Sequence, residues 1–329
     1  MRSAVDVTKT HVAAEFNVGS PLISCRYHPT GQYIFAGAQD YRVWRVDTKG
    51  NKTPFVADAW VRGIAFTEQG RVLLTGGYDG RLSWWDALGD GKQPLRSVDA
   101  HQGWIRAVAV SADGKLAATA GNDLVVRLWS VNDGKLVREL SGHQSHVYNV
   151  AFHPHQARLV SGDLKAELFD WDVTTGVRQR HWQIKALYKY DGGFRADIGG
   201  TRTMRFDAEG KRLAVGGITN VTNAFAGVGN PLVVVVDWTS GKQQEYHSKS
   251  KPRGVAWGVA FLADGTIVAC SGGGSGGLLL FWQPGKKDAF HETKLPNTAR
   301  DLDLAPDGQH VVTAHYDGRL RVSKLGPKS

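Results

Sequence analysis

The chain alternates between short apolar runs and polar turns that contain glycine. One turn type recurs between two such runs, and its seven sequences are HPTGQ (28–32), TEQGR (67–71), SADGK (111–115), HPHQA (153–157), DAEGK (207–211), LADGT (262–266) and APDGQ (305–309). Counted at the fourth residue of each turn, the interval ranges from 39 residues (31 to 70) to 55 residues (210 to 265). Such runs and turns predict antiparallel strands, with about four strands in each repeat.

A second turn, Tyr-Asp-Gly-Arg-Leu, occurs twice, at 78–82 and at 316–320. Glycine readily adopts a positive φ, and aspartate tolerates it while bonding its own backbone, so an Asp-Gly pair favours a tight turn. Both copies lie between apolar runs in the same frame of the repeat. Seven such repeats favour a closed ring of small sheets over a stack of helices.

One repeat carries the fullest set of polar residues, namely His101, Thr119, Asp123 and Trp129. Together with Trp-Asp pairs at 85–86 and 171–172 and a Gly-His pair at 142–143, these residues make the chain resemble the WD40-repeat β-propellers. The resemblance implies that the four residues form a hydrogen-bonded structural tetrad. It also implies an all-β, seven-bladed β-propeller whose blades are four-stranded antiparallel sheets. In the fourth repeat we expect Lys165 at the aspartate position, which would break the tetrad there.

We expect residues 1–329 to form a single propeller domain whose blades begin near 21, 60, 104, 146, 200, 255 and 298. The last blade offers only three apolar runs after Ala299 before the chain ends. Its fourth strand is predicted at residues 10–17, where HVAAEF (11–16) reads like KLVREL (135–140). This N-terminal strand would close the ring and leave no open sheet edge.

Composition agrees with a β fold, because the 329 residues include 40 Gly and 11 Trp but 2 Met. The first thirty residues lack the pattern of a signal peptide, and no apolar run reaches the roughly 18 residues of a membrane-spanning helix. We therefore expect a cytoplasmic protein that does not act on membranes. Cys25 and Cys270 lie in apolar runs far apart, which favours two buried thiols over a disulfide or a metal site.

Residue patterns typical of enzymes are scarce. His143, His146, His153 and His155 fall at opposite ends of one predicted strand, whereas a zinc site needs ligands that converge on one point. The run SGGGSGG (271–277) lacks the Lys-Ser/Thr of a phosphate-binding loop, so a turn is favoured there. We expect no catalytic residue, no metal and no cofactor. A propeller hydrolase or lyase that uses the central channel is the disfavoured alternative.

The first strand of each blade has one leading exposed position, occupied in chain order by Ile23, Arg62, Arg106, Tyr148, Arg202, Trp257 and Arg300. Trp60 and Trp104 lie two residues before this position, and Tyr78 and Tyr316 precede the aspartates of the repeated turn. Apart from Ile23, these residues are the predicted binding rim, because arginine with exposed aromatic residues is typical of interaction hot spots. The alternative is that the tryptophans pack between blades and the arginines pair with loop carboxylates.

Two long loops of the fifth blade, 187–200 (LYKYDGGFRADIGG) and 220–231 (NVTNAFAGVGNP), are expected at the same rim. Loops add function to a rigid scaffold without altering it, so these segments favour a partner contact there. The alternative is that they merely cover the blade.

The net charge of +9 favours acidic partners, although no run of Lys and Arg concentrates it. We predict a non-catalytic protein-protein interaction scaffold or adaptor that binds an acidic peptide or protein surface at the rim. Nucleic-acid binding through the same rim, with arginines on phosphates and tryptophans stacked on bases, is the alternative. A steep dependence of affinity on salt would identify it.

Overall fold

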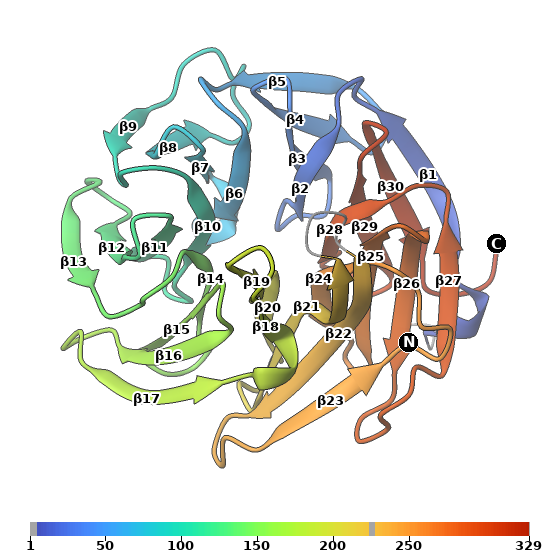
Figure 1. Ribbon diagram of the computed structural model, residues 1–329. Coiled ribbons are helices and arrows are strands. Elements are labelled where there is room, and N and C mark those ends of the chain that lie inside the picture. Colours follow the sequence, from blue (N-terminus) through green and yellow to red (C-terminus); the bar gives the residue numbers. More distant parts are fainter. Residues whose placement is uncertain (1–4, 224–227, 329) are drawn as a thin grey trace.

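The computed structural model describes residues 5–223 and 228–328. Within these residues the strands form seven four-stranded antiparallel sheets and one two-stranded hairpin. Figure 1 shows the seven sheets arranged as blades around a central axis, with the first strand of each blade innermost. The all-β, seven-bladed propeller predicted from the sequence is therefore confirmed.

The first four blades follow the chain in order. Blade one contains β2 (Leu22–Tyr27), β3 (Tyr33–Ala38), β4 (Arg42–Asp47) and β5 (Lys52–Val56). Blade two contains β6 (Val61–Phe66), β7 (Val72–Gly77), β8 (Arg81–Asp86) and β9 (Arg96–Asp99). Blade three contains β10 (Ile105–Val110), β11 (Leu116–Gly121), β12 (Val126–Ser130) and β13 (Leu136–Leu140). Blade four contains β14 (Val147–Phe152), β15 (Arg158–Asp163), β16 (Glu167–Asp172) and β17 (Arg178–Gln183).

The remaining blades follow a hairpin of β18 (Tyr188–Asp191) and β19 (Ala196–Gly199). Blade five contains β20 (Thr203–Phe206), β21 (Arg212–Asn223), β22 (Val228–Asp237) and β23 (Gln243–His247). Blade six contains β24 (Val255–Phe261), β25 (Ile267–Gly273), β26 (Gly276–Trp282) and β27 (His291–Leu295). Blade seven contains β28 (Ala299–Leu304), β29 (His310–His315), β30 (Arg319–Lys324) and β1 (His11–Asn17). Short 3-10 helices are η1 (Val7–Lys9), η2 (Glu68–Gly70) and η3 (Lys185–Leu187).

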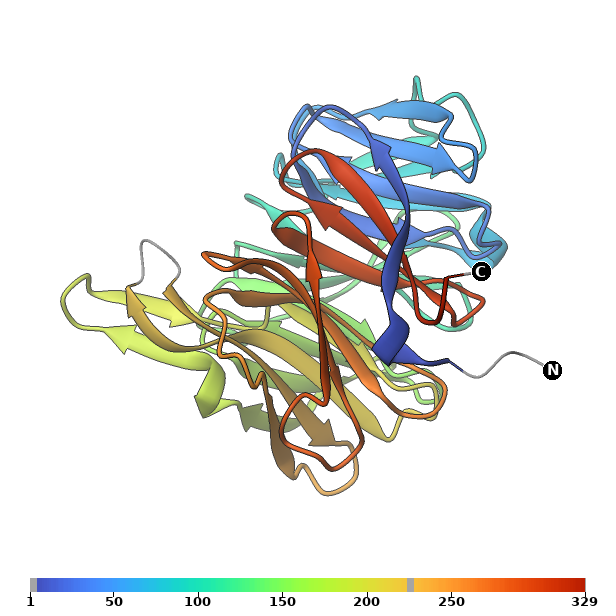
Figure 2. The same cartoon turned by 90° about the vertical axis from the view of Figure 1, so that its right-hand side faces the viewer.

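The N-terminal strand closes the ring. β1 pairs antiparallel with β30 along its whole length, from His11 opposite Lys324 to Asn17 opposite Arg319. The carboxylate of Glu15 forms an ion pair with the Arg321 guanidinium, and Oε2 of Glu15 lies 2.6 Å from Nε of Arg321. Figure 2 shows β1 running along the outer side of the last blade. The predicted closure by the N-terminal strand is thus confirmed, and it joins the two ends of the chain in one sheet.

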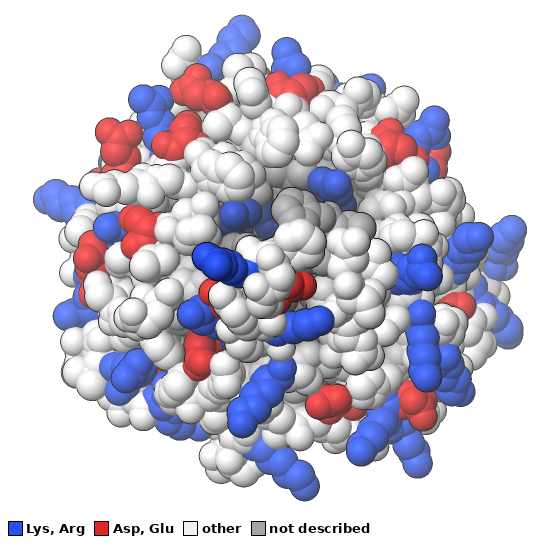
Figure 3. Space-filling model, viewed as in Figure 1, with Lys and Arg blue, Asp and Glu red and all other residues white. Residues whose placement is uncertain are grey.

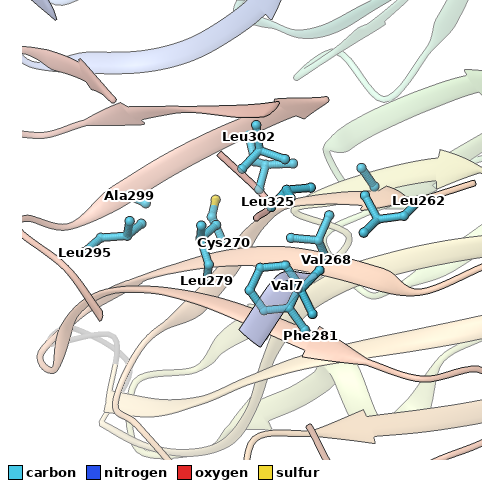
Figure 4. Packing of buried hydrophobic residues seen from close by; sticks show 12 residues of the cluster. Val7, Leu262, Val268, Cys270, Leu279, Phe281, Leu295, Ala299, Leu302 and Leu325 are labelled. Atoms are coloured by element: carbon cyan, nitrogen blue, oxygen red, sulfur yellow. The ribbon is translucent and has the colours of Figure 1, made fainter. Parts of the chain in front are cut away.

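The hydrophobic core lies between neighbouring blades. One cluster combines Val7 from η1 with Phe281 and Cys270 of blade six and Leu302 of blade seven (Figure 4). Burying each large side chain of this kind stabilises the fold by about 1.5–3 kcal/mol. Because each blade packs on its neighbours, the axis of the ring remains available for a channel.

The repeated Tyr-Asp-Gly turn needs its glycine for two reasons. Gly80 and Gly318 adopt φ values of +82° and +79°, which side chains disfavour. A Cβ on Gly80 would lie 2.2 Å from the carbonyl oxygen of His101, and therefore clash with the next blade. The turn thus reverses the chain and also allows a close contact between two blades.

Among the described residues, neither the two cysteines nor the helices indicate a further functional site. Cys25 and Cys270 are free and buried, and burial raises the pKa of both thiols well above the usual value. Among the described residues, no helix has the length and apolar character needed to cross a membrane.

Blade three contains the hydrogen bonds expected of a tetrad. His101 Nδ1 lies 2.8 Å from Asp123 Oδ1, and its Nε2 lies 2.7 Å from Thr119 Oγ1. The indole of Trp129 donates to the same hydroxyl at 2.9 Å. Three elements of the blade are therefore fixed to one another through a single buried hydroxyl.

Blade four corrects one sequence expectation. His143 contacts Asp163 at 2.8 Å and Ser161 at 2.7 Å, and Trp171 donates to Ser161 at 2.8 Å. The network is therefore present, and the expectation that Lys165 breaks it is wrong. The carboxylate comes from the last residue of β15, two positions before the residue that sequence spacing selects, and Lys165 turns outward to Asp197 at 3.6 Å.

Blade seven contains a buried histidine, from which we predict that the folded protein becomes less stable in acid. His315 is fully buried, with Nδ1 2.9 Å from the Asn297 carbonyl oxygen and Nε2 2.7 Å from Thr313 Oγ1. Burial, and then the nearby Arg321 charge, lower the pKa of His315 to about 4. As the pH falls below about 6.5, the unfolded chain therefore gains a proton that the folded protein takes up only near pH 4.

We expect this histidine to reduce the free energy of unfolding by about 2 kcal/mol between pH 7 and pH 5, at about 1.4 kcal/mol per pH unit. Urea unfolding at the two pH values measures the change. The His315→Gln variant should lose less stability over the same interval than the parent protein. An equal loss in both proteins would assign the acid sensitivity to other groups.

Candidate functional site

In most blades, a β-bulge in the first strand leaves one residue outside the regular pairing. In six blades the register between the first two strands shifts around a single residue, and these residues are Ile23, Arg62, Arg106, Tyr148, Trp257 and Arg300. In blade five, Arg202 directly precedes β20, and its N–H donates to the Gly216 carbonyl at 2.8 Å. A bulged residue lies outside the regular pairing, so its side chain is re-aimed. These are the seven positions that sequence alignment of the repeats selected.

The selected side chains converge on one cavity of about 200 Å³ at the mouth of the central channel. Eight of the ten predicted rim residues line it, and they are Trp60, Arg62, Tyr78, Arg106, Tyr148, Arg202, Trp257 and Arg300. Figure 3 views this face of the ring and shows basic atoms in the hollow near its centre. We call this space the mouth cavity.

The two other predicted rim residues lie beside the mouth cavity. Trp104 is 43% exposed and stacks on Tyr78, with ring centroids 4.4 Å apart. Tyr316 is 50% exposed and lies under Arg300, whose guanidinium carbon is 4.5 Å from the ring centroid. All ten residues therefore belong to one connected surface, although two of them face solvent.

Arginines and aromatic rings alternate around the mouth cavity. The Arg106 guanidinium lies 5.5 Å from the ring centroid of Tyr78 and 4.9 Å from that of Tyr148. Arg202 continues the series at 4.5 Å from Tyr148 and 5.7 Å from Trp257. Such cation–π contacts hold the guanidinium groups in place without neutralising their charge.

Within the described part of the chain, the four arginines of the mouth cavity lack a carboxylate partner. Among the described residues, none of Arg62, Arg106, Arg202 and Arg300 forms an ion pair with Asp or Glu. The Nε of Arg202 is buried without a hydrogen-bond partner in the same residues. Burial and the charge of Arg62 lower the pKa of both Arg202 and Arg300. The cavity therefore concentrates positive charge, since arginine stays protonated at neutral pH.

Deeper in the channel the arginines are neutralised. Arg26 contacts Asp301 at 2.7 Å, and Arg205 of blade five contacts Asp303 of blade seven, also at 2.7 Å. These residues line a second cavity of about 560 Å³, which shares Arg62, Arg106, Arg202 and Trp257 with the mouth cavity. The channel thus changes from a basic mouth to a balanced interior, and the ion pair between blades five and seven spans it.

Two projections rise beside the mouth cavity. The segment 187–200 forms the β18–β19 hairpin, and β21 and β22 extend beyond the rest of their blade. Figures 1 and 2 show both on the same side of the ring. Tyr190 and Phe194 of the hairpin are 55% and 53% exposed. Of the second predicted loop, 220–231, residues 224–227 lie outside the described part of the chain.

The histidines singled out in the sequence serve separate local contacts. His143 belongs to the network of blade four, and His153 Nε2 lies 2.9 Å from the Gly210 carbonyl oxygen of the next blade. Over residues 5–223 and 228–328, no group of three His, Cys, Asp or Glu side chains is arranged to hold a metal ion. The glycine-rich run 271–277 covers the end of β25, the turn at residues 274–275 and the start of β26.

The chain is similar to one family model and to several known proteins. Three stretches of the chain, 52–86, 92–130 and 134–170, match the family model described as WD domain, G-beta repeat. The chain is also similar to Transcription initiation factor TFIID subunit 5 of Caenorhabditis elegans, with 27% identity over 47% of this chain and 24% of the relative.

Two further relatives extend the likeness. Protein groucho of Drosophila melanogaster is 22% identical over 91% of this chain and 38% of its own length. WD repeat and SOCS box-containing protein 1 of Homo sapiens is 29% identical over 35% of this chain and 27% of its own length. The chain thus spans less than two fifths of each of these three relatives.

Proposed function

Because the chain is a WD40-repeat β-propeller, we propose that it is a non-catalytic interaction scaffold or adaptor that binds an acidic peptide or protein surface at the mouth cavity. The observation that supports this proposal is the set of four arginines that have no carboxylate partner among residues 5–223 and 228–328. The ligand would supply the missing negative charge. We place the protein in the cytoplasm as part of the same proposal.

The geometry of the cavity favours an acidic group over a neutral one. Guanidinium forks bind carboxylates through paired, charge-assisted hydrogen bonds. Trp60, Tyr148 and Trp257 line the same cavity and would keep water away from those bonds. The exposed aromatic residues of the β18–β19 hairpin stand beside the site and offer a second contact to a partner chain.

The test is a charge reversal of all four arginines. We expect Arg62→Glu, Arg106→Glu, Arg202→Glu and Arg300→Glu in one protein to lower the recovery of acidic partners from a cell extract at least tenfold. Buried arginine anchors each contribute about 2 kcal/mol or more to binding, which accounts for a loss of this size. Capture with and without nuclease, followed by mass spectrometry, measures the recovery.

A matched control separates the site from overall charge. Lys49, Lys92, Lys115 and Lys135 are exposed, and their change to Glu alters the net charge by the same amount. This control should retain the partners. Circular dichroism must show that both variants fold, and the corresponding Arg→Gln set replaces the charge reversal if it does not. Equal capture by the parent and the arginine variant would refute the proposed site.

Nucleic-acid binding is the second outcome of this test. The stacked and partly exposed ring of Trp104 beside Arg106 is compatible with an unpaired base. Partners that disappear after nuclease treatment would favour it. A steep fall of log affinity with log salt would then follow from the release of phosphate counterions.

A further inference from the structure

We propose that blade two, formed by β6 to β9 (Figure 1), contains a binding site for an imidazole ring. Three of the four tetrad positions are kept in this blade as Thr75, Asp79 and Trp85, whereas Ala57 replaces the histidine. These four residues line a cavity of about 340 Å³, which we call the blade-two cavity. It shares no described lining residue with the mouth cavity. The ring would come from a histidine side chain of a partner or from a free imidazole compound.

The backbone shows that Ala57 and His101 occupy the same position in their blades. The N–H of His101 donates to the carbonyl of Gly80, in the turn of the preceding blade, at 3.0 Å. The N–H of Ala57 donates at 2.9 Å to the carbonyl of Tyr41, which lies in the corresponding turn one blade earlier. Blade three therefore fills this position with an imidazole, and blade two fills it with a methyl group.

The buried hydroxyl of the tetrad has fewer contacts in blade two than in blade three. Trp85 donates to Thr75 Oγ1 at 2.9 Å, which is the same distance as in blade three. In blade three the hydroxyl of Thr119 also lies 2.7 Å from the imidazole of His101. Within the described part of the chain, the hydroxyl of Thr75 has no hydrogen-bond partner besides the indole. Its own hydrogen therefore remains available to a ligand.

The carboxylate of Asp79 turns into the blade-two cavity. A Cβ on Gly77 would lie 2.3 Å from Oδ1 of Asp79. A Cβ on Gly121, the corresponding glycine of blade three, would lie 2.2 Å from Nδ1 of His101. A polar atom therefore lies over the glycine in both blades. Because Asp79 is exposed, its side chain can rotate outward to the position from which Asp123 contacts His101 at 2.8 Å.

The blade-two cavity is open at the place where the other two blades cover their imidazole. Arg127 covers the ring in blade three, with its Nη1 2.9 Å from His101 Nδ1. Phe169 stacks on His143 in blade four, with ring centroids 4.1 Å apart. In the strand pairing, both covering residues lie opposite the tetrad hydroxyl, and the residue opposite it in blade two is Ser83. A ring can therefore enter blade two from outside.

The polar groups of the blade-two cavity match imidazole better than other rings. Neutral imidazole has one N–H donor and one acceptor nitrogen, whereas indole has a donor alone. The donor would face Asp79, and the acceptor would receive the hydroxyl hydrogen of Thr75. A carboxylate ligand would instead meet Asp79 with the same charge. The volume lies within the roughly 300–1,000 Å³ of small-molecule sites, so the ring fits together with its stem.

The tryptophan indoles report on the site separately. Nitrogen–proton correlation NMR of the full chain follows them during addition of imidazole at about pH 8, where an imidazole with a pKa near 6.5 is neutral. We expect the Trp85 signal to move and to saturate in the millimolar range, because the ligand bonds to the hydroxyl that this indole uses. Trp129 and Trp171 should not move, because their blades already contain a histidine.

Two further ligands test the hydrogen bonds and the source of the ring. Neutral 1-methylimidazole keeps the ring but has no N–H donor. We expect it to bind at least tenfold more weakly than imidazole, since it loses the hydrogen bond to a charged carboxylate. N-acetylhistidine methylamide presents the ring as a side chain. Tighter binding of this compound than of imidazole supports a partner's histidine, and equal or weaker binding supports a free imidazole compound.

Variants of the chain locate the site. Ala57→His supplies the ring from the chain itself, so it should raise the melting temperature, move the Trp85 signal without ligand and abolish the response to imidazole. Asp79→Asn keeps an oxygen for the turn but loses the charge, and should weaken imidazole binding at least tenfold. The matched control is Asp113→Asn, because both aspartates are exposed and accept the N–H two residues later at 3.1 Å. This control should leave imidazole binding unchanged.

Three results would overturn the inference. The first is a Trp85 signal that does not move when imidazole is added, or that moves no more than those of Trp129 and Trp171. The second is a response to imidazole that persists in the Ala57→His variant. The third is equal binding of imidazole and 1-methylimidazole. The arginines of the mouth cavity take no part in these measurements, so the proposed function is tested separately.

Discussion

Deletion of residues 1–17 is expected to make the protein insoluble or dimeric and to lower the free energy of unfolding by about 5 kcal/mol or more. The deletion removes β1 and therefore the partner of every residue from Arg319 to Lys324 in β30. The buried side chain of Val7 and the partly buried side chains of Val12 and Phe16 are lost from the core as well. Full burial of such a side chain contributes about 1.5–3 kcal/mol, and partial burial contributes less. β30 would remain paired with β29 but would present its other edge, now open, to other chains.

Size-exclusion chromatography and thermal unfolding measure this effect. A synthetic peptide of residues 5–17, added to the shortened protein, should pair with β30 and restore the monomer. A peptide of the same composition in scrambled order serves as the control, because it lacks the alternation that fits the blade. A shortened protein that stays monomeric with an unchanged melting temperature would show that ring closure contributes little.

The second large effect is expected from Asp163→Ala in blade four. The carboxylate is buried and accepts from His143 at 2.8 Å and from the backbone N–H groups of Lys165 and Glu167 at 2.9 and 3.0 Å. Removing it leaves these donors without an acceptor in a site closed to water. Breaking a buried network in this way costs about 3–5 kcal/mol. Urea unfolding of the variant and the parent protein measures the loss.

Lys165→Ala is the matched comparison, because sequence spacing assigns the aspartate position to this residue. Its amine lies 3.6 Å from Asp197 in a partly exposed ion pair, and such pairs contribute up to about 1 kcal/mol. The two variants should therefore differ in stability by at least about 2 kcal/mol. Similar losses from both would contradict the assignment of Asp163 to the network.

The fold could be predicted from the sequence because its turns recur in a regular pattern. Asp-Gly turns such as 113–114 and 307–308 sit in the same frame, and each marks the same hairpin of a blade. Ring closure was accessible because the last blade lacks one apolar run and the N-terminus supplies it. In contrast, the error at Lys165 arose because spacing cannot show that blade four takes its carboxylate from the last residue of β15, whereas blade three takes it from Asp123, two residues after β11 ends.

The residues of the candidate site could be predicted from the sequence, but the contacts that they form could not. Aligning the repeats selects Arg106 and Tyr148 at one position, and the structure brings both to one cavity. No residue type identifies the bulges that turn these two side chains toward the cavity, because a bulge is a property of two paired strands. Sequence also left open whether the arginines stay available at the rim or pair with loop carboxylates. That choice depends on neighbours from other blades, such as Tyr148 beneath Arg202.

The bulges also separate the architecture of the ring from its specificity. A residue at position 62, 106 or 300 is left out of the regular strand pairing, and its side chain lines the mouth cavity, so the strand register does not dictate its identity. Six bulged positions and Arg202, one from each blade, line the same cavity. The propeller is therefore a fixed frame that brings seven side-chain positions together at one place, and if the proposed function holds, a different set of residues there would change the ligand while the blades stay the same.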